Sequence, residues 1–182
     1  KDGEKEIFKT QLLGSHNVQN MLLAIAVAHI FDIRLKTMAL AASKIEPVEH
    51  RLELKKEGEL YIIDDAFNSN PIGAKNAVEI LSRFDSGRRI IITPGMIELG
   101  EMEEKMNYEF GQAIGNARLD LVVLVGYKKT EAIKEGIAST GYPDEKVKVT
   151  GSLFKANDIM KNYAKAGDVI LYENDLPDTF NE

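Results

Sequence analysis

Residues Leu60–Ala77 read LYIIDDAFNSNPIGAKNA. An apolar run rich in β-branched and aromatic residues, Leu60–Ile63, ends abruptly in two carboxylates, and Pro71 then opens a stretch whose apolar residues recur at helical spacing. This order predicts a buried strand, a polar loop and a helix. In a parallel α/β sheet the loop at the carboxyl end of a strand faces the ligand crevice, so this loop is expected to carry functional side chains.

Apolar runs and helical patterns alternate through the rest of the chain. The expected strands are Arg89–Thr93, Leu121–Val125, Lys146–Val149 and Val169–Tyr172, and amphipathic segments fill the intervals between them. Such alternation is typical of parallel βαβ units. The sequence therefore predicts an α/β fold with a Rossmann-like, mostly parallel sheet flanked by helices.

The first part of the chain has a different, mainly helical pattern. Residues 6–13 resemble a short strand, and a helix with a broad apolar face is expected next, capped by Ser15 or Asn17, with His29 packed or at its rim. A second short helix is expected over Thr37–Ser43, before Pro47. We place a domain boundary there: residues 1–47 are expected to be the remnant of another domain, and residues 48–182 the Rossmann-like domain. The absence of an initiator Met is consistent with a chain that begins inside a longer polypeptide.

Composition narrows the class of protein. The chain has 182 residues, 44% of them hydrophobic, which is enough for a sizeable core. Its formal net charge of -6 argues against nucleic acid as a partner, because phosphate backbones require a basic surface. The absence of cysteine rules out disulfides and thiolate metal sites and fits a reducing cytoplasm, and no apolar run approaches the ~20 residues of a membrane span.

Asp64 and Asp65 are neighbours at the end of the central strand, so their side chains are expected on opposite faces. One of them is expected to face the crevice and the other to be structural or solvated. In the same loop, Asn70 before Pro71 is favoured as a helix cap, whereas Asn68 has no such structural role and is the better candidate for ligand contact.

Further polar candidates come from three other places in the chain. His16 and Asn17 precede a helix, and Asn20 shares a helix face with Asn17, so two carboxamides are available to the edge of a base. Arg51 is positioned either to clamp a phosphate or to pair with Glu49 or Glu53. Glu98, in the loop after the strand at 89–93, is expected on the crevice side. Neither a Gly-x-x-x-x-Gly-Lys-[Ser/Thr] loop nor a Gly-x-Gly-x-x-Gly loop is present.

Several of these pieces, in this order, resemble the carboxyl-terminal half of the Mur ligase family, which builds the peptide of bacterial cell-wall precursors. The matching segments are GSHNxxN at 14–20, EHR at 49–51, DDAFNSNP at 64–71, GMIELG at 95–100, and the tail from Gly167 to Asp178. The DDAFNSNP and GMIELG pieces most resemble the members that join D-alanyl-D-alanine to UDP-N-acetylmuramoyl-tripeptide. Phe67 stands where relatives often have Tyr.

The resemblance implies a cytoplasmic, ATP-dependent amide ligase that works through an acyl phosphate. It implies that Asn17 and Asn20 line the adenine, Arg51 meets the ATP phosphates and Asp65 holds the ribose. Asn68 and Asn70 would shape the crevice near the incoming dipeptide and the nucleotide. Mg²⁺ and most of the catalytic apparatus would belong to a central ATP-binding domain, of which residues 1–47 would be the end, and the uridine nucleotide would be held by an amino-terminal domain absent from this chain. No catalytic residue and no metal ligand is assigned within it, and the chain is expected to be inactive alone.

Two alternatives to this function stay open at the level of sequence. One is another amino-acid ligase of the same superfamily, which would share the architecture and take a different acceptor. The other is a degenerate homologue that binds a nucleotide or a protein partner without catalysis.

Overall fold

The computed structural model describes residues 3–67 and 70–174. Its core is a six-stranded sheet with the order β1-β2-β6-β3-β4-β5, in which β1 is antiparallel to β2 and all other neighbours are parallel. The helices are α1 Ser15–Ile30, α2 Leu35–Ala42, α3 Pro71–Ser82, α4 Glu103–Asn116, α5 Glu131–Ser139 and α6 Leu153–Tyr163, with short 3₁₀ turns at Gly100–Met102 and Asp144–Lys146. The strands are β1 Glu53–Glu57, β2 Leu60–Asp65, β3 Arg89–Thr93, β4 Leu121–Val125, β5 Val147–Thr150 and β6 Val169–Glu173. The predicted mostly parallel α/β sheet is confirmed.

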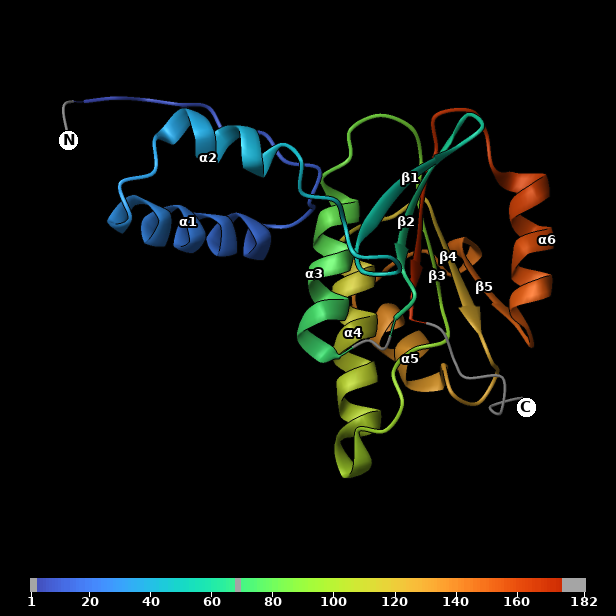
Figure 1. Cartoon of the computed structure of the whole chain (residues 1–182). Coiled ribbons are helices and arrows are strands. Elements are labelled where there is room, and N and C mark those ends of the chain that lie inside the picture. The colour runs from blue at the N-terminus through green and yellow to red at the C-terminus, as the bar shows by residue number, and fades with distance from the viewer. Residues whose placement is uncertain (1–2, 68–69, 175–182) are drawn as a thin grey trace.

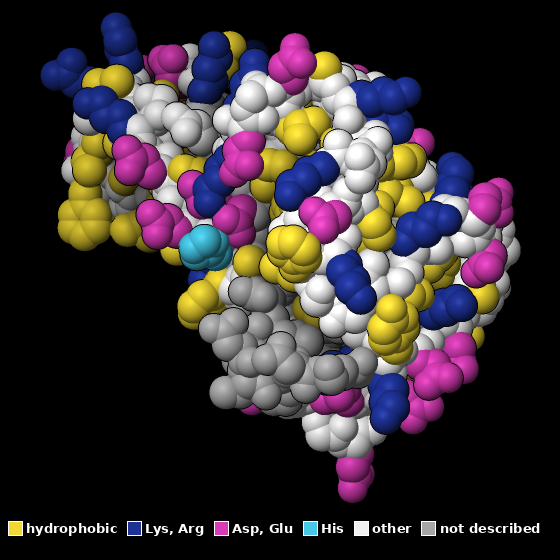
Figure 2. Space-filling model, turned by 90° about the vertical axis from the view of Figure 1, so that its right-hand side faces the viewer, with side chains coloured by type: hydrophobic (Ala, Val, Ile, Leu, Met, Phe, Trp, Pro, Cys, Tyr) yellow, Lys and Arg dark blue, Asp and Glu magenta, His cyan; other side chains and the backbone are white. Residues whose placement is uncertain are grey.

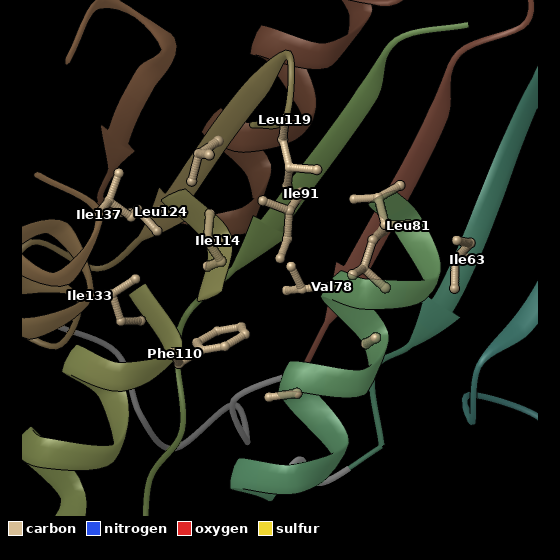
Figure 3. Close-up of a cluster of buried hydrophobic side chains, with 14 of the residues drawn as sticks. Ile63, Val78, Leu81, Ile91, Phe110, Ile114, Leu119, Leu124, Ile133 and Ile137 are labelled. Carbon is tan, nitrogen blue, oxygen red and sulfur yellow. The ribbon is translucent and has the colours of Figure 1, made fainter. Parts of the chain in front are cut away.

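Helices cover the two faces of the sheet unequally. The helices α3, α4 and α5 pack on one face, whereas α6 alone packs on the other (Figure 1). The larger core cluster lies under the three helices, and Figure 3 shows Phe110 and Ile114 of α4 beside Val78 and Leu81 of α3 over the sheet. The α6 side mixes acidic, basic and scattered hydrophobic side chains (Figure 2). Most of the buried hydrophobic packing against the sheet is therefore on the face covered by α3, α4 and α5.

The central strand, loop and helix form as the sequence predicts. Ile62 and Ile63 of β2 are buried, because this strand lies between β1 and β6. The Asn70 side chain accepts hydrogen bonds from the N–H groups of Ile72 and Gly73 at 3.1 and 3.0 Å, and Pro71 takes the first helical position, where its missing N–H costs nothing. The cap fixes where α3 begins, and so fixes the loop that precedes it.

The first helices form a hairpin beside the sheet domain (Figure 1). Helix α1 buries none of its residues, and its Leu22, Leu23 and Ile30 are 60%, 68% and 77% exposed. Leu13, just before α1, packs against the larger core cluster and so connects the hairpin to the sheet domain. The apolar face predicted for α1 is present, but within residues 3–67 and 70–174 nothing covers it.

Two expectations for the first part of the chain are wrong. Residues 6–13 form no strand, because no other described segment pairs with them. Neither Ser15 nor Asn17 caps α1: Gly14 occupies the cap position with φ +93°, and the Asn17 side-chain amide instead donates to the Leu13 carbonyl at 2.8 Å. Of the two positions expected for His29, its exposure excludes a packed one and agrees with the rim of the helix.

Candidate functional site

A cavity of about 510 Å³ lies where the segment before α1 meets the carboxyl end of β2 and the start of α3. The predicted residues that line it are His16, Asn17, Arg51, Asp65 and Asn70. They come from segments up to 54 positions apart in sequence, since the range runs from 16 to 70, and the fold brings them to one place. The other walls are mostly apolar or backbone, including Phe67 and Leu52. Apolar walls with a few convergent polar groups are typical of small-molecule sites.

Arg51 enters this cavity on an unusual stretch of backbone. Both of its neighbours, His50 and Leu52, have left-handed φ angles of +60° and +49°, which non-glycine residues seldom adopt. The guanidinium carbon of Arg51 lies 4.5 Å from the centre of the Phe67 ring. The predicted alternative, a salt bridge to Glu49 or Glu53, is absent from the described part of the chain, where Glu53 pairs with Lys55 instead. The guanidinium N–H groups therefore stay available to an anion.

Asp65 fixes the backbone beyond Arg51. Its Oδ1 accepts a hydrogen bond from the Leu52 N–H at 3.1 Å, while the carboxylate lines the cavity. Burial raises the pKa of Asp65 above its usual value, and the Leu52 N–H together with the charges of Arg51 and His16 only partly offsets that rise. A partly desolvated carboxylate beside a cavity is suited to accept further hydrogen bonds from a ligand.

Asp64 has the structural role that the sequence left open for one member of the pair. Its Oδ2 lies 2.9 Å from the His50 Nδ1 and 2.7 Å from the Lys55 Nζ, and its side chain does not line the cavity. Burial alone would raise the pKa of Asp64, but hydrogen bonds from Lys55, His50 and the Ala66 N–H bring it below the usual value. Asp64 thus stays ionised and holds His50, the residue before Arg51.

The remaining predicted residues do not converge on the cavity. Asn20 is exposed on α1 and lies outside its lining. Glu98 is exposed in the loop after β3, with a φ of +63°, and does not line it either. Asn68 lies outside the described residues, as does the tail segment 175–178 that contributed to the resemblance.

Sequence reasoning missed two features of this edge of the sheet. It did not assign Phe67 a contact with Arg51. It also missed the buried pair at the ends of β3 and β6, where the Thr93 hydroxyl donates to the Glu173 carboxylate at 2.8 Å. Glu173 at the end of β6 and Thr93 at the end of β3 were the available signal, because adjacent parallel strands place their ends together.

Comparison with known proteins gives a consistent result. The family model described as Mur ligase, glutamate ligase domain, matches residues 50–172. A UDP-N-acetylmuramoyl-tripeptide--D-alanyl-D-alanine ligase of Bacillus subtilis is 31% identical over 173 residues, which are 94% of this chain and 37% of that protein. The chain thus spans little more than a third of that relative's length.

Solved structures share the fold. A MurF crystal structure from Acinetobacter baumannii superposes with a TM-score of 0.76 at 21% identity, covering 93% of this chain and 36% of that one. The MurF ligase of Thermotoga maritima in complex with ADP gives a TM-score of 0.74, also at 21% identity, covering 89% and 35%. The similarity extends over both the hairpin and the sheet domain.

Proposed function

This chain belongs to the Mur ligase family, and we propose that it is the carboxyl-terminal part of an ATP-dependent ligase that adds D-alanyl-D-alanine to UDP-N-acetylmuramoyl-tripeptide. In that reaction the terminal carboxylate of the tripeptide takes the γ-phosphoryl group of ATP, with release of ADP. The amine of the dipeptide then attacks the acyl phosphate, and phosphate leaves as the amide forms. The 31% identity to a ligase of that name supports this acceptor over other amino acids.

The observation that carries the proposal is that the Arg51 guanidinium and the Asp65 carboxylate line one cavity, while no described residue forms a salt bridge with Arg51. Arginine offers a planar set of donors that matches phosphate, and a carboxylate is suited to ribose hydroxyls. We therefore assign Arg51 to the ATP phosphates and Asp65 to the ribose. Asn17 has its amide donor engaged with Leu13, which directs the carboxamide oxygen as the acceptor for adenine.

We also propose the domain organisation. Residues 1–47 would be the end of a central nucleotide-binding domain, and residues 48–182 the closing domain. The exposed apolar face of α1 supports this division, and so does the start of the family match at residue 50. No group of three or more His, Asp or Glu side chains in the described segments is arranged to hold a metal ion. As the family resemblance implies, we propose that Mg²⁺ is held mainly by the central domain that precedes this chain.

The cavity lies between these two units, so the ATP site would be complete only when both are in place. Asn70 caps α3 and lines the cavity, and we propose that it keeps the loop toward the dipeptide in position. We place the enzyme in the cytoplasm, where ATP is supplied. No helix of the described residues is long and apolar enough to span a membrane.

The test is phosphate release by the full-length polypeptide with ATP, Mg²⁺ and UDP-N-acetylmuramoyl-tripeptide, with D-alanyl-D-alanine or single amino acids offered in turn. We expect release that requires the dipeptide and falls at least about tenfold in Arg51→Ala, since a charge-assisted phosphate contact contributes about 1.5–3 kcal/mol. Phosphate release with a single amino acid would agree with the Mur ligase family but would show that the acceptor is not D-alanyl-D-alanine. No release with any acceptor would favour the non-catalytic binding module.

A further inference from the structure

Phe67 is a large apolar side chain that stays 55% exposed on the wall of the cavity. Its ring faces the Arg51 guanidinium, with 4.5 Å between the guanidinium carbon and the ring centre. We infer that Phe67 is a positioning residue, which holds the face of the Arg51 guanidinium so that its edge points at the nucleotide phosphates. This inference rests on the proposed function and adds a residue to its ATP site.

The backbone brings the ring to Arg51 and keeps it there. The Phe67 N–H donates to the His50 carbonyl at 3.1 Å, so the loop after β2 is tied directly to the residue before Arg51. The Arg51 N–H in turn donates to the Val48 carbonyl at 3.1 Å. The Asp64 carboxylate also contacts the His50 ring, and the Asp65 carboxylate accepts from the Leu52 N–H. The end of β2 and the loop after it are thus joined to the segment before β1 on both sides of Arg51. The main chain therefore holds Phe67 and Arg51 close enough for the ring and the guanidinium to meet.

Arg88 shows how the same fold holds an arginine whose role is structural. Its guanidinium also lies over a ring, 4.2 Å from the centre of Tyr163, but it pairs with Asp168 through Nη2 at 2.6 Å and Nε at 3.2 Å. Arg51 has the ring, but among residues 3–67 and 70–174 no carboxylate forms a salt bridge with it. Aromatic contact uses the face of the guanidinium and leaves its N–H edge and its charge available, whereas a carboxylate occupies both. The choice of a ring at this position preserves an anion site.

Positioning has an energetic consequence for binding. A free arginine side chain loses rotamer entropy when a ligand immobilises it. A ring that already restricts the side chain removes part of that cost before the nucleotide arrives. Phe67 should therefore strengthen the ATP interaction without touching ATP, and its effect should exist only while Arg51 is present.

A double-mutant cycle in the full-length polypeptide tests this dependence. The variants are Phe67→Leu, Arg51→Ala and the pair, with kcat/KM for ATP measured by phosphate release at saturating acceptor. We expect Phe67→Leu to lower kcat/KM for ATP about three- to tenfold, as the loss of one cation–π contact allows. In the Arg51→Ala background the same change should have an effect within about twofold, because the residue on which it acts is gone.

Further variants and readouts separate positioning from structure. Phe67→Tyr keeps the ring and should restore kcat/KM for ATP, while Phe67→Met keeps apolar bulk without the ring and should behave as Phe67→Leu. The matched control is Phe154→Leu on α6, where a 72% exposed ring lies 6.0 Å from the Lys161 ammonium outside the cavity; it should match wild type. The midpoint of thermal unfolding should be the same for all Phe67 variants, and kcat/KM for the acceptor should not change.

The outcomes are distinct. Wild-type kinetics in Phe67→Leu would overturn the inference, and so would an equal loss with and without Arg51, which would mean that Phe67 acts on a substrate directly. If Arg51→Ala itself leaves kcat/KM for ATP unchanged, the proposed ATP site is wrong and the role of Phe67 is wrong with it. If Arg51→Ala is impaired and Phe67→Leu is not, the proposed function stands and only the positioning role is lost.

Discussion

Oδ1 of Asp65 accepts a hydrogen bond from the Leu52 N–H at 3.1 Å, and Leu52 has a φ of +49°. The carboxylate at the end of β2 thus stabilises a backbone conformation that a leucine seldom adopts. Burial of the same carboxylate raises its pKa, so the charged form is disfavoured in the folded state. One residue therefore both orders the neighbourhood of Arg51 and weakens the fold by carrying a charge there.

This dual role predicts opposite effects of Asp65→Asn on stability and on binding. Asparagine keeps an oxygen for the Leu52 N–H and removes the buried charge, so the free energy of unfolding at pH 7 should equal or exceed that of wild type. ATP affinity of the full-length polypeptide should fall about tenfold or more, as expected for losing a charged hydrogen-bond acceptor. Urea unfolding and equilibrium ATP binding are the measurements.

The effect of Asp65→Asn on the free energy of unfolding should depend on pH. A carboxyl group whose folded pKa is raised binds protons more readily in the folded state, so its unfavourable contribution is present at neutral pH and disappears as pH falls through that raised pKa. The stability difference between Asp65→Asn and wild type should shrink over the same range. A variant that is clearly less stable than wild type at pH 7 would contradict this account.

Asp168 differs from Asp65 in that its pKa is lowered rather than raised in the folded state. Burial alone would raise its pKa, but hydrogen bonds from the Arg88 side chain and from the N–H groups of Lys165 and Arg88 bring it below the usual value. The carboxylate is 3% exposed, so Asp168→Asn leaves Arg88 without its partner and should cost about 3 kcal/mol. Urea unfolding at pH 7 measures this loss.

The contribution of Asp168 should also depend on pH with the opposite sign. Its depressed pKa means that its stabilisation is present above the unfolded-state pKa and is lost as pH falls through the folded one. The gap between wild type and Asp168→Asn should therefore close in acid. Asp158→Asn, which breaks an exposed pair with Lys161, should change stability by less than about 1 kcal/mol and serves as the control. Equal losses of unfolding free energy in Asp168→Asn and Asp158→Asn would contradict a larger contribution from the buried pair.

Asn70 allows capping and ligand contact to be separated. Asn70→Ala removes the acceptor for the Ile72 and Gly73 N–H groups and should lower the free energy of unfolding by about 1 kcal/mol. Asn70→Asp keeps that acceptor and should retain stability. If Asn70→Asp nevertheless lowers kcat/KM for D-alanyl-D-alanine, the side chain also contacts or positions the substrate. Unchanged kinetics would mean that Asn70 acts only as a helix cap.

Close contact between α4 and α5 depends on glycine. A Cβ on Gly111 would lie 2.1 Å from the Ile133 carbonyl oxygen, so the two helix backbones touch at that point. Gly→Ala within a helix ordinarily stabilises it, but Gly111→Ala should instead cost about 1–3 kcal/mol because the helices must separate. The control is Gly151→Ala, where the nearest atom belongs to the exposed Tyr127 ring. Comparable thermal unfolding midpoints for the two variants would show that the helices can adjust.

Local patterns were sufficient for most of the fold. The strand, cap and helix over residues 60–82 are confirmed, because each depends on contacts within a few residues of sequence. The short strand at 6–13 is wrong for the opposite reason: a strand needs a partner, and the described chain supplies none. The Asn17 cap fails because Gly14, with φ +93°, begins α1 earlier and turns the amide back to Leu13.

The site was less predictable, because it depends on contacts between distant segments. Arg51, Asp65 and Asn70 were recognisable as polar residues at loops and do line one cavity. Their roles there remain proposals. The contact of Phe67 with Arg51 requires the loop after β2 to reach back to residue 50, and no spacing in the sequence indicates that. The left-handed backbone at His50 and Leu52 could not be predicted either, since neither residue type favours it.

The apolar face of α1 gives the last prediction. Leu23 and Val27 lie four positions apart on one helix, are 68% and 55% exposed, and belong to a helix that buries nothing. A contiguous apolar surface of this kind promotes association, so the 182-residue chain alone should form oligomers as its concentration rises. Light scattering should show a higher mass for the chain than for its Leu23→Lys/Val27→Lys variant, while Phe154→Lys on α6 should associate as wild type does. A chain that stays monomeric at every concentration would mean that the hairpin covers this face in solution.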